Sequence, residues 1–116
     1  MANKVVHFDV VGKDGAKLQQ FYGGLFGWKI DASNPMNYGI VSPDDAGLGG
    51  GIAATDEGEG HLTFYVAVDD LEAALDEAER LGGKTVMPPT EIPNMVTFAM
   101  FTDPEGHVVG LVKNDS

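Results

Sequence analysis

The side chains best suited to chemistry lie on two short alternating stretches of the sequence. His7 and Asp9 are two residues apart in the first stretch, and Thr63 and Tyr65 have the same spacing in the second. Residues two apart in a strand project from the same face. An imidazole with its usual pKa of about 6.5 can donate a hydrogen bond or act as a general base, and a carboxylate can orient it or meet a cationic ligand. The spacing predicts a polar face for binding or proton transfer, with solvated or packed side chains as the alternative.

The composition excludes several other kinds of chemistry. There are no cysteines, which rules out disulfides, thiolate metal sites and cysteine nucleophiles. No serine stands in a nucleophile-elbow motif, and no helix pattern or lysine follows the glycines at 49–51 to make a phosphate-binding loop. The 7 Lys and Arg residues against 18 Asp and Glu give a net charge of −11. This charge repels nucleic acid and anionic membranes, and it suits either a cationic ligand or solubility alone.

No stretch of the sequence predicts a membrane or secretory destination. No apolar run reaches the roughly 20 residues that a spanning helix needs. The first ten residues lead straight into a strand without a signal-peptide core. We therefore expect a cytoplasmic protein with no membrane partner.

Two similar halves carry the polar residues. His7–Ile30 aligns without a gap with Thr63–Val86, and each copy reads as a strand, a turn, a helix, a glycine stop and a further strand. Such an internal repeat decides how the whole chain is organised. We predict a first βαβββ module at residues 1–54, an acidic linker at 55–60 and a second βαβββ module at 61–116. Together the two modules are expected to form one compact domain.

Hydrophobic patterning predicts the elements of each half. In the first half a strand spans about Val5–Val11, and Gly27 ends the helix that follows. That helix has an apolar stripe of Leu18, Phe21, Tyr22 and Leu25. The other expected strands are Trp28–Ile30, Tyr38–Val41, Gly49–Ala54, His61–Val68, Lys84–Met87, Met95–Phe101 and His107–Lys113.

Turn and cap signals complete this outline. Ser42–Gly47 is expected to be a turn, and Pro88–Pro93 an irregular loop. Asp69 with Glu72 three residues later reads as a capping pair for the second helix. The buried stripe of that helix is expected to be Leu71, Ala74, Leu75, Ala78 and Leu81.

The two leading strands differ between their faces. Their even-numbered residues are apolar and should meet the helices, whereas the odd-numbered face is mixed and lines either solvent or a cleft. Two such sheets side by side would curl into an open trough. Phe98 and Met100 share a strand face, and they would line an apolar part of this trough or belong to the core.

Three features together resemble a known group of proteins. They are the paired βαβββ modules, the FYGGLFGWKI stretch that closes the first helix, and the TDPEGHVVGLVK ending. The chain resembles the vicinal oxygen chelate superfamily, which contains glyoxalase I, extradiol dioxygenases, fosfomycin-resistance enzymes and bleomycin-resistance proteins. The ending is similar to the family's DP-x-G-N-x-x-E-L hairpin. The resemblance implies an α+β, glyoxalase-like fold of two paired βαβββ modules in a curled open β-trough, commonly as a homodimer.

The resemblance also implies where metal ligands would lie. Metal-binding members place one ligand on each leading strand and one on each closing strand. In this chain these positions are His7, Gly51, Thr63 and Gly110. One imidazole and one hydroxyl fall short of the three or four protein ligands that catalytic zinc commonly has. We therefore predict no metal and no cofactor.

The resulting hypothesis is a metal-free binder of a small organic molecule, similar to the bleomycin-resistance branch. Its predicted ligand-binding residues are His7, Asp9, Thr63, Tyr65, Phe98 and Met100. One alternative is a glyoxalase-like or dioxygenase-like enzyme, which would work by acid–base chemistry through His7 or through an atypical site of His7, His61 and Asp9. A second alternative is a fold retained for interaction alone, with His7 a remnant of a metal-binding ancestor. The sequence leaves open whether the protein is an enzyme and names no catalytic residue.

Overall fold

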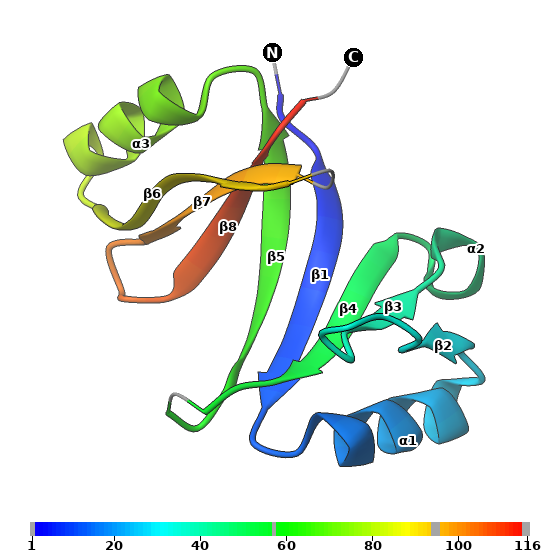
Figure 1. The fold of residues 1–116 in the computed structure, drawn as a ribbon. Helices are drawn as coiled ribbons and strands as arrows, with labels where there is room; N and C mark the ends of the chain where they lie inside the picture. Colours follow the sequence, from blue (N-terminus) through cyan, green and yellow to red (C-terminus); the bar gives the residue numbers. More distant parts are fainter. Residues whose placement is uncertain (1, 57, 94–95, 115–116) are drawn as a thin grey trace. The chain divides into compact units, whose positions relative to one another are not determined.

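The computed structural model describes residues 2–56, 58–93 and 96–114, and the chain divides into two units (Figure 1). The N-terminal unit is Val6–Thr63, and the C-terminal unit is Phe64–Ser116 together with Met1–Val5. Each unit contains a leading strand, a helix and three further strands. This order confirms the predicted α+β class. Within the described residues, no helix has both the length and the apolar composition to cross a membrane.

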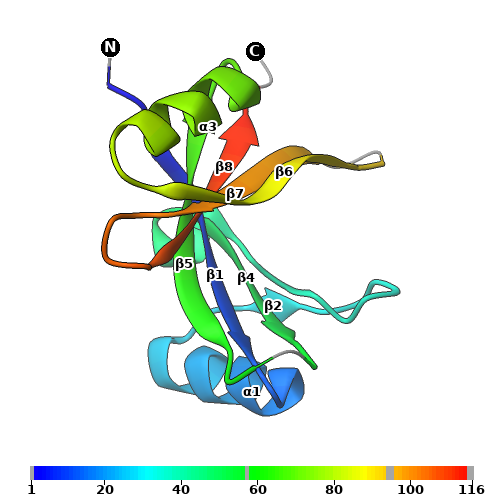
Figure 2. The ribbon, with the colours of Figure 1, turned by 90° about the vertical axis from the view of Figure 1, so that its left-hand side faces the viewer.

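The N-terminal unit has a four-stranded mixed sheet in the order β2-β3-β4-β1. Strands β1 and β4 are parallel, and the other pairs are antiparallel. Its elements are β1 (Val5–Gly12), α1 (Gly15–Phe26), β2 (Ile30–Asp31), β3 (Gly39–Val41), α2 (Pro43–Ala46) and β4 (Gly49–Ala54). Helix α1 covers one face of this sheet (Figure 2), with a core of Val10, Val41 and Ile52 between them.

Helix α1 ends at Gly27, as predicted, with a left-handed φ of 75°. Its predicted apolar stripe is correct at Leu18 and Tyr22, which pack on the core, and wrong at Phe21 and Leu25, which are 58% and 61% exposed. The stripe was misjudged because a buried glycine shares the sheet-facing side. A Cβ on Gly15 would lie 2.7 Å from the backbone nitrogen of Ala54, so the helix approaches β4 more closely than a side chain allows.

The segment Ser42–Gly47 is a short helix, α2, rather than the predicted turn. The Ser42 side chain accepts a hydrogen bond from the backbone N–H of Asp44, and Pro43 occupies the first helical turn. A serine cap followed by proline favours helix initiation. Gly47 then ends this helix with a φ of 92°.

The C-terminal unit has a sheet in the order β5-β8-β7-β6, in which β5 and β8 are parallel. Its elements are β5 (His61–Val68), α3 (Leu71–Arg80), β6 (Lys84–Ile92), β7 (Val96–Thr102) and β8 (Val108–Lys113). Helix α3 packs on one face of β5, β7 and β8 through a core of Val68, Leu71, Leu75, Ala99 and Leu111. The predicted β7 start at Met95 lies outside the described residues.

Helix α3 begins one residue later than the capping prediction. The carboxylate of Asp70 accepts a hydrogen bond from the backbone N–H of Ala73, whereas Asp69 accepts one from the side chain of Asn114. Asp69 as the cap was therefore wrong. Leu81 is also wrong as a stripe residue: it follows the last helical residue and is 63% exposed.

Pro88 and Pro89 lie in a strand rather than in the predicted irregular loop, whereas Pro93 follows the end of that strand. Strand β6 continues to Ile92, with irregularities in its pairing to β7 on both sides of Met87. It is the last strand in the order of this sheet. An edge strand tolerates proline because its outer N–H groups have no ladder partner to lose.

Candidate functional site

The N-terminal unit brings three polar side chains into one cluster of His7, Asp9 and Tyr38. His7 and Asp9 come from alternate positions of β1, and Tyr38 immediately precedes β3. Nε2 of His7 lies 2.8 Å from the Tyr38 hydroxyl oxygen and 3.2 Å from Oδ1 of Asp9. The Tyr38 hydroxyl donates a 2.5 Å hydrogen bond to the same Oδ1. The structure thus joins the first two predicted site residues and adds a third that the sequence prediction missed.

Glycines of β4 make room for this cluster. A Cβ on Gly51 would lie 1.8 Å from both Cζ and the hydroxyl oxygen of Tyr38, so this ring occupies the space that a side chain at position 51 would need. On Gly50, a Cβ would lie 2.1 Å from the ring of Phe8, which packs with the α1-side core. Gly50 and Gly51 therefore allow the close approach of aromatic rings, whereas a Cβ on Gly49 would meet only ordinary contacts at 3.9 Å.

Asn34 holds Tyr38 in place through its backbone. The Asn34 side chain accepts a hydrogen bond from the Tyr38 N–H at 3.0 Å and donates one to the Tyr38 carbonyl at 2.8 Å. The Asn34-Pro35 turn was visible in the sequence, but nothing in the pattern indicated that it fixes a tyrosine 31 positions from His7. The distance in sequence is why the third member of the cluster was missed.

The cluster is partly buried, with Asp9 its most buried member. Asp9 is 9% exposed, and the His7 side chain is 32% exposed. Burying a carboxylate is unfavourable unless hydrogen bonds replace its water, and Asp9 obtains this from its two neighbours. A buried carboxylate beside a partly exposed imidazole can orient the ring and position it for proton transfer.

Thr63 and His61, which the sequence also indicated as candidates, differ in their exposure to solvent. Thr63 is 8% exposed at the end of the N-terminal unit, while His61 is exposed. Within residues 2–56, 58–93 and 96–114, no group of three or more His, Asp or Glu side chains is arranged to hold a metal ion. The alternative site of His7, His61 and Asp9 is therefore not formed.

In the C-terminal unit too, a tyrosine ring covers a strand glycine. Tyr65 on β5 pairs with Gly110 on β8, as Asp9 pairs with Gly51 in the other unit. A Cβ on Gly110 would lie 2.2 Å from the Tyr65 ring. This ring therefore lies against the β8 backbone on the side of the sheet away from the α3 core.

Phe98 and Met100 belong to the same side of that sheet. Their neighbours Ala99 and Phe101 pack in the α3 core, so the alternating residues point away from it. Met100 pairs with Gly110, and Phe98 with Val112. The structure thus decides that Phe98 and Met100 are not part of this core, while the six-residue ligand lining stays a prediction.

The residues at the implied metal positions do not fit a metal. Gly51 and Gly110 have no side-chain donor, and tyrosine rings fill the space where a side chain would begin. His7 contributes its Nε2 to the cluster with Asp9 and Tyr38. A divalent catalytic ion needs a donor set of three or four protein ligands, and these positions supply an imidazole and a hydroxyl.

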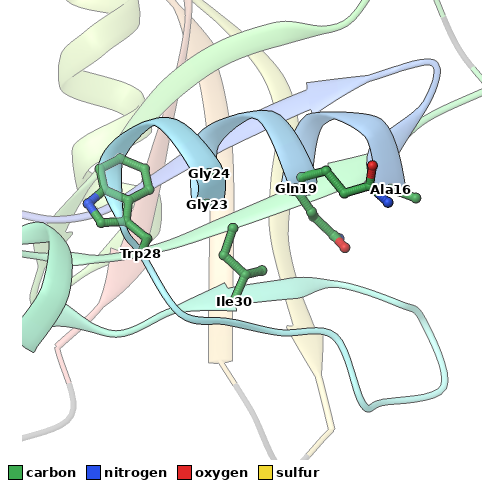
Figure 3. A pocket seen from close by; sticks show the side chains of 7 residues that line it. Ala16, Gln19, Gly23, Gly24, Trp28 and Ile30 are labelled. Atoms are coloured by element: carbon green, nitrogen blue, oxygen red, sulfur yellow. The ribbon is translucent and has the colours of Figure 1, made fainter.

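A shallow hollow of about 400 Å³ lies beside α1 in the N-terminal unit (Figure 3). It is lined by Ala16, Gln19, Gln20, Gly23, Gly24, Trp28 and Ile30. Trp28 closes one end of it (Figure 3), and the Gln19 amide donates to the carbonyls of Asn37 and Ile52. None of the predicted site residues lines this hollow, which contains no titratable side chain.

A family model described as the Glyoxalase/Bleomycin resistance protein/Dioxygenase superfamily matches residues 4–111. The chain belongs to this superfamily. The match covers both units and confirms the resemblance seen in the sequence. Among solved structures, the hypothetical protein BH1468 from Bacillus halodurans C-125 has the same fold as this superfamily member, with a TM-score of 0.71 at 13% identity. That likeness covers 100% of this chain and 97% of the other.

Two curated relatives of this superfamily member are considerably longer. CFP32 of Mycobacterium tuberculosis is 31% identical over 91 residues, covering 78% of this chain and 35% of CFP32. The anthracycline biosynthesis protein DnrV of Streptomyces peucetius is 30% identical over 117 residues, covering 85% of this chain and 42% of DnrV. The chain therefore spans well under half the length of either relative.

Proposed function

We propose that the chain is a small-molecule binding protein of the glyoxalase superfamily that recognises an organic ligand without a metal. The observation that carries this proposal is the closed cluster of His7, Asp9 and Tyr38 at the leading-strand position where metal-binding relatives place a ligand. Small-molecule sites usually orient their ligand through a small number of convergent polar groups, and this cluster supplies three. The name of DnrV, an anthracycline biosynthesis protein, agrees with an organic ligand.

The metal-free part of the proposal depends on the two glycines. At Gly51 and Gly110 the backbone is covered by tyrosine rings, so a coordinating side chain there would require the rings to move. Elemental analysis of protein purified without chelators tests this point directly. We expect no stoichiometric transition metal, and one tightly held iron, zinc, nickel or manganese per subunit would overturn it.

The binding part is tested with a thermal-shift panel of small aromatic compounds and antibiotics, followed by calorimetry on the compounds that stabilise the protein. We expect His7→Ala to weaken the affinity at least tenfold, because it removes the imidazole and leaves Asp9 partly unsatisfied. His107→Ala is the matched control, since the His107 side chain is 74% exposed on the other unit. Equal affinities for wild type and His7→Ala would remove His7 from the site.

A second candidate is an enzyme that transfers a proton through His7. The contact of Nε2 with Asp9 at 3.2 Å favours it, because a carboxylate behind an imidazole is the usual means of orienting a general base. Incubating each binding compound in deuterated water with the protein tests this candidate. Deuterium incorporation that disappears in His7→Ala supports it, and binding without exchange favours the first proposal.

We also propose a cytoplasmic homodimer. On α1 three large apolar side chains, Phe21, Leu25 and Phe26, are each more than half exposed. The ring of Phe26 contacts Trp28 at 5.1 Å, which extends the apolar surface beyond the helix. Such a surface on a small acidic protein favours association with a second copy. Light scattering after gel filtration should give a dimer mass for wild type and a monomer mass for Phe21→Ser/Leu25→Ser, and a monomeric wild type would contradict the proposal.

A further inference from the structure

The three contacts described between His7, Asp9 and Tyr38 are all satisfied when Asp9 is ionised and Nε2 of His7 carries a hydrogen. The Tyr38 hydroxyl has a single hydrogen, and it is donated to Oδ1 of Asp9 at 2.5 Å. Nε2 of His7 lies 2.8 Å from the Tyr38 oxygen and 3.2 Å from Oδ1. Both oxygens present lone pairs to this nitrogen, because an ionised carboxylate only accepts hydrogen bonds and the phenol hydrogen points elsewhere.

We infer that Tyr38 is a positioning residue which, with Asp9, fixes neutral His7 as the Nε2-protonated tautomer. A bare Nε2 would place a lone pair against two oxygen lone pairs at hydrogen-bond distance. The hydrogen must therefore be on Nε2, and the basic lone pair of the ring is on Nδ1. The second nitrogen of an imidazole is commonly set in this way by the partner of the first.

This assignment adds detail to the proposed proton transfer through His7. Its functional meaning rests on that proposal. In this tautomer Nε2 donates within the cluster, and the lone pair that could accept a proton is on Nδ1. Tyr38 does not need to touch the ligand for this effect, since it acts through the imidazole. Its ring is held against Gly51 and its backbone by Asn34, so the hydroxyl is kept in place.

His107 provides a comparison for the tautomer of His7 within the same chain. Nδ1 of His107 lies 2.9 Å from Oδ2 of Asp103, so its carboxylate partner faces the opposite ring nitrogen. Neutral His107 should therefore favour the Nδ1-protonated tautomer. The two histidines are expected to give opposite patterns in one spectrum, which separates the effect of partners from any general preference of the imidazole ring.

The test is a long-range proton–nitrogen correlation spectrum of the ligand-free, ¹⁵N-labelled protein at a pH about 1.5 above the usual imidazole pKa. For His7 we expect a protonated Nε2 and a bare Nδ1, and the reverse tendency for His107. Tyr38→Phe keeps the ring over Gly51 but removes the hydroxyl, so the ratio of His7 tautomers should fall about tenfold, the usual weight of one hydrogen bond.

Tyr22→Phe is the matched control, because it removes the hydroxyl of a tyrosine that packs against the α1-side core of the same unit. It should leave the His7 signals unchanged. A wild-type spectrum with a bare Nε2 on His7, or His7 signals that Tyr38→Phe does not move, would overturn the assignment. The spectrum contains no ligand, so this outcome is independent of the calorimetric test of binding.

Discussion

The close approach of Tyr38 to Gly51 makes a strong prediction about the substitution Gly51→Ala. The added Cβ would lie 1.8 Å from the tyrosine ring, far inside any normal contact, and the conformation of Gly51 is not one that a side chain otherwise avoids. The ring must therefore move away from β4. Its displacement also breaks the hydroxyl contacts with His7 and Asp9.

The expected magnitude follows from two opposing effects. Overpacking a well-filled site typically destabilises by about 1–3 kcal/mol, and each lost hydrogen bond removes about 1 kcal/mol. Replacing glycine by alanine also restricts the unfolded chain, which raises the free energy of unfolding by about 0.4–1 kcal/mol. We expect Gly51→Ala to lower the free energy of unfolding by about 2–4 kcal/mol, with most of the loss caused by Tyr38.

A double-mutant cycle with Tyr38→Ala isolates this cause. Urea unfolding followed by the fluorescence of Trp28, the one tryptophan of the chain, reports on the N-terminal unit. In the Tyr38→Ala background, Gly51→Ala should be neutral or slightly stabilising, which gives a coupling free energy of at least about 1 kcal/mol. Gly24→Ala, which meets no atom within 4 Å, is the control and should stabilise. Additive effects of the two substitutions would refute the reasoning.

Three further predictions concern the other unit and the core. Asp103 has its pKa lowered mainly by the backbone N–H of His107, so its stabilising effect is present above its usual value of 3.8 and is lost as the pH falls through the lower folded value. The stability gap between wild type and Asp103→Asn in urea titrations should therefore shrink below that pH. By circular dichroism melting, Asp70→Ala should destabilise by about 1 kcal/mol as the loss of a helix cap, and Asp69→Ala by clearly less. Ile52→Ala, at a fully buried position, should destabilise by about 2–5 kcal/mol in urea.

Periodicity predicted the main elements because each strand and helix buries a regular face. Strand β4 was predicted with its observed ends, and the alternation in β1 placed Phe8 and Val10 toward the helix and His7 and Asp9 away from it. These outcomes follow from local geometry, since a strand alternates its side chains whatever surrounds it.

The errors arose where a neighbour in space decides the outcome. Phe21 and Leu25 fit a helical stripe but are exposed, and the side of the helix that faces the sheet carries Gly15, Leu18 and Tyr22. Pro88 and Pro89 are compatible with a strand because that strand lies at the end of its sheet order. Neither fact is a property of the local sequence.

The same reasoning explains why the candidate site was half predicted. His7 and Asp9 share one strand, so their spacing alone brought them together, whereas Tyr38 reaches them across β4. The glycines at 49–51 were the available signal, because a strand without side chains must be covered by something else. A search for aromatic residues beside such a strand would have considered Tyr38.

At Gly51 and Gly110, the absence of a coordinating side chain and the position of a tyrosine ring are sterically linked. A coordinating side chain at Gly51 and the ring of Tyr38 would occupy the same volume, since the first side-chain atom would already lie 1.8 Å from the ring. The same exclusion holds at Gly110 and Tyr65, at 2.2 Å. Each position can therefore hold either a ligand or a seated ring. In the N-terminal unit the seated ring places a phenol hydroxyl against His7 and Asp9, where a coordinating side chain at position 51 would otherwise extend.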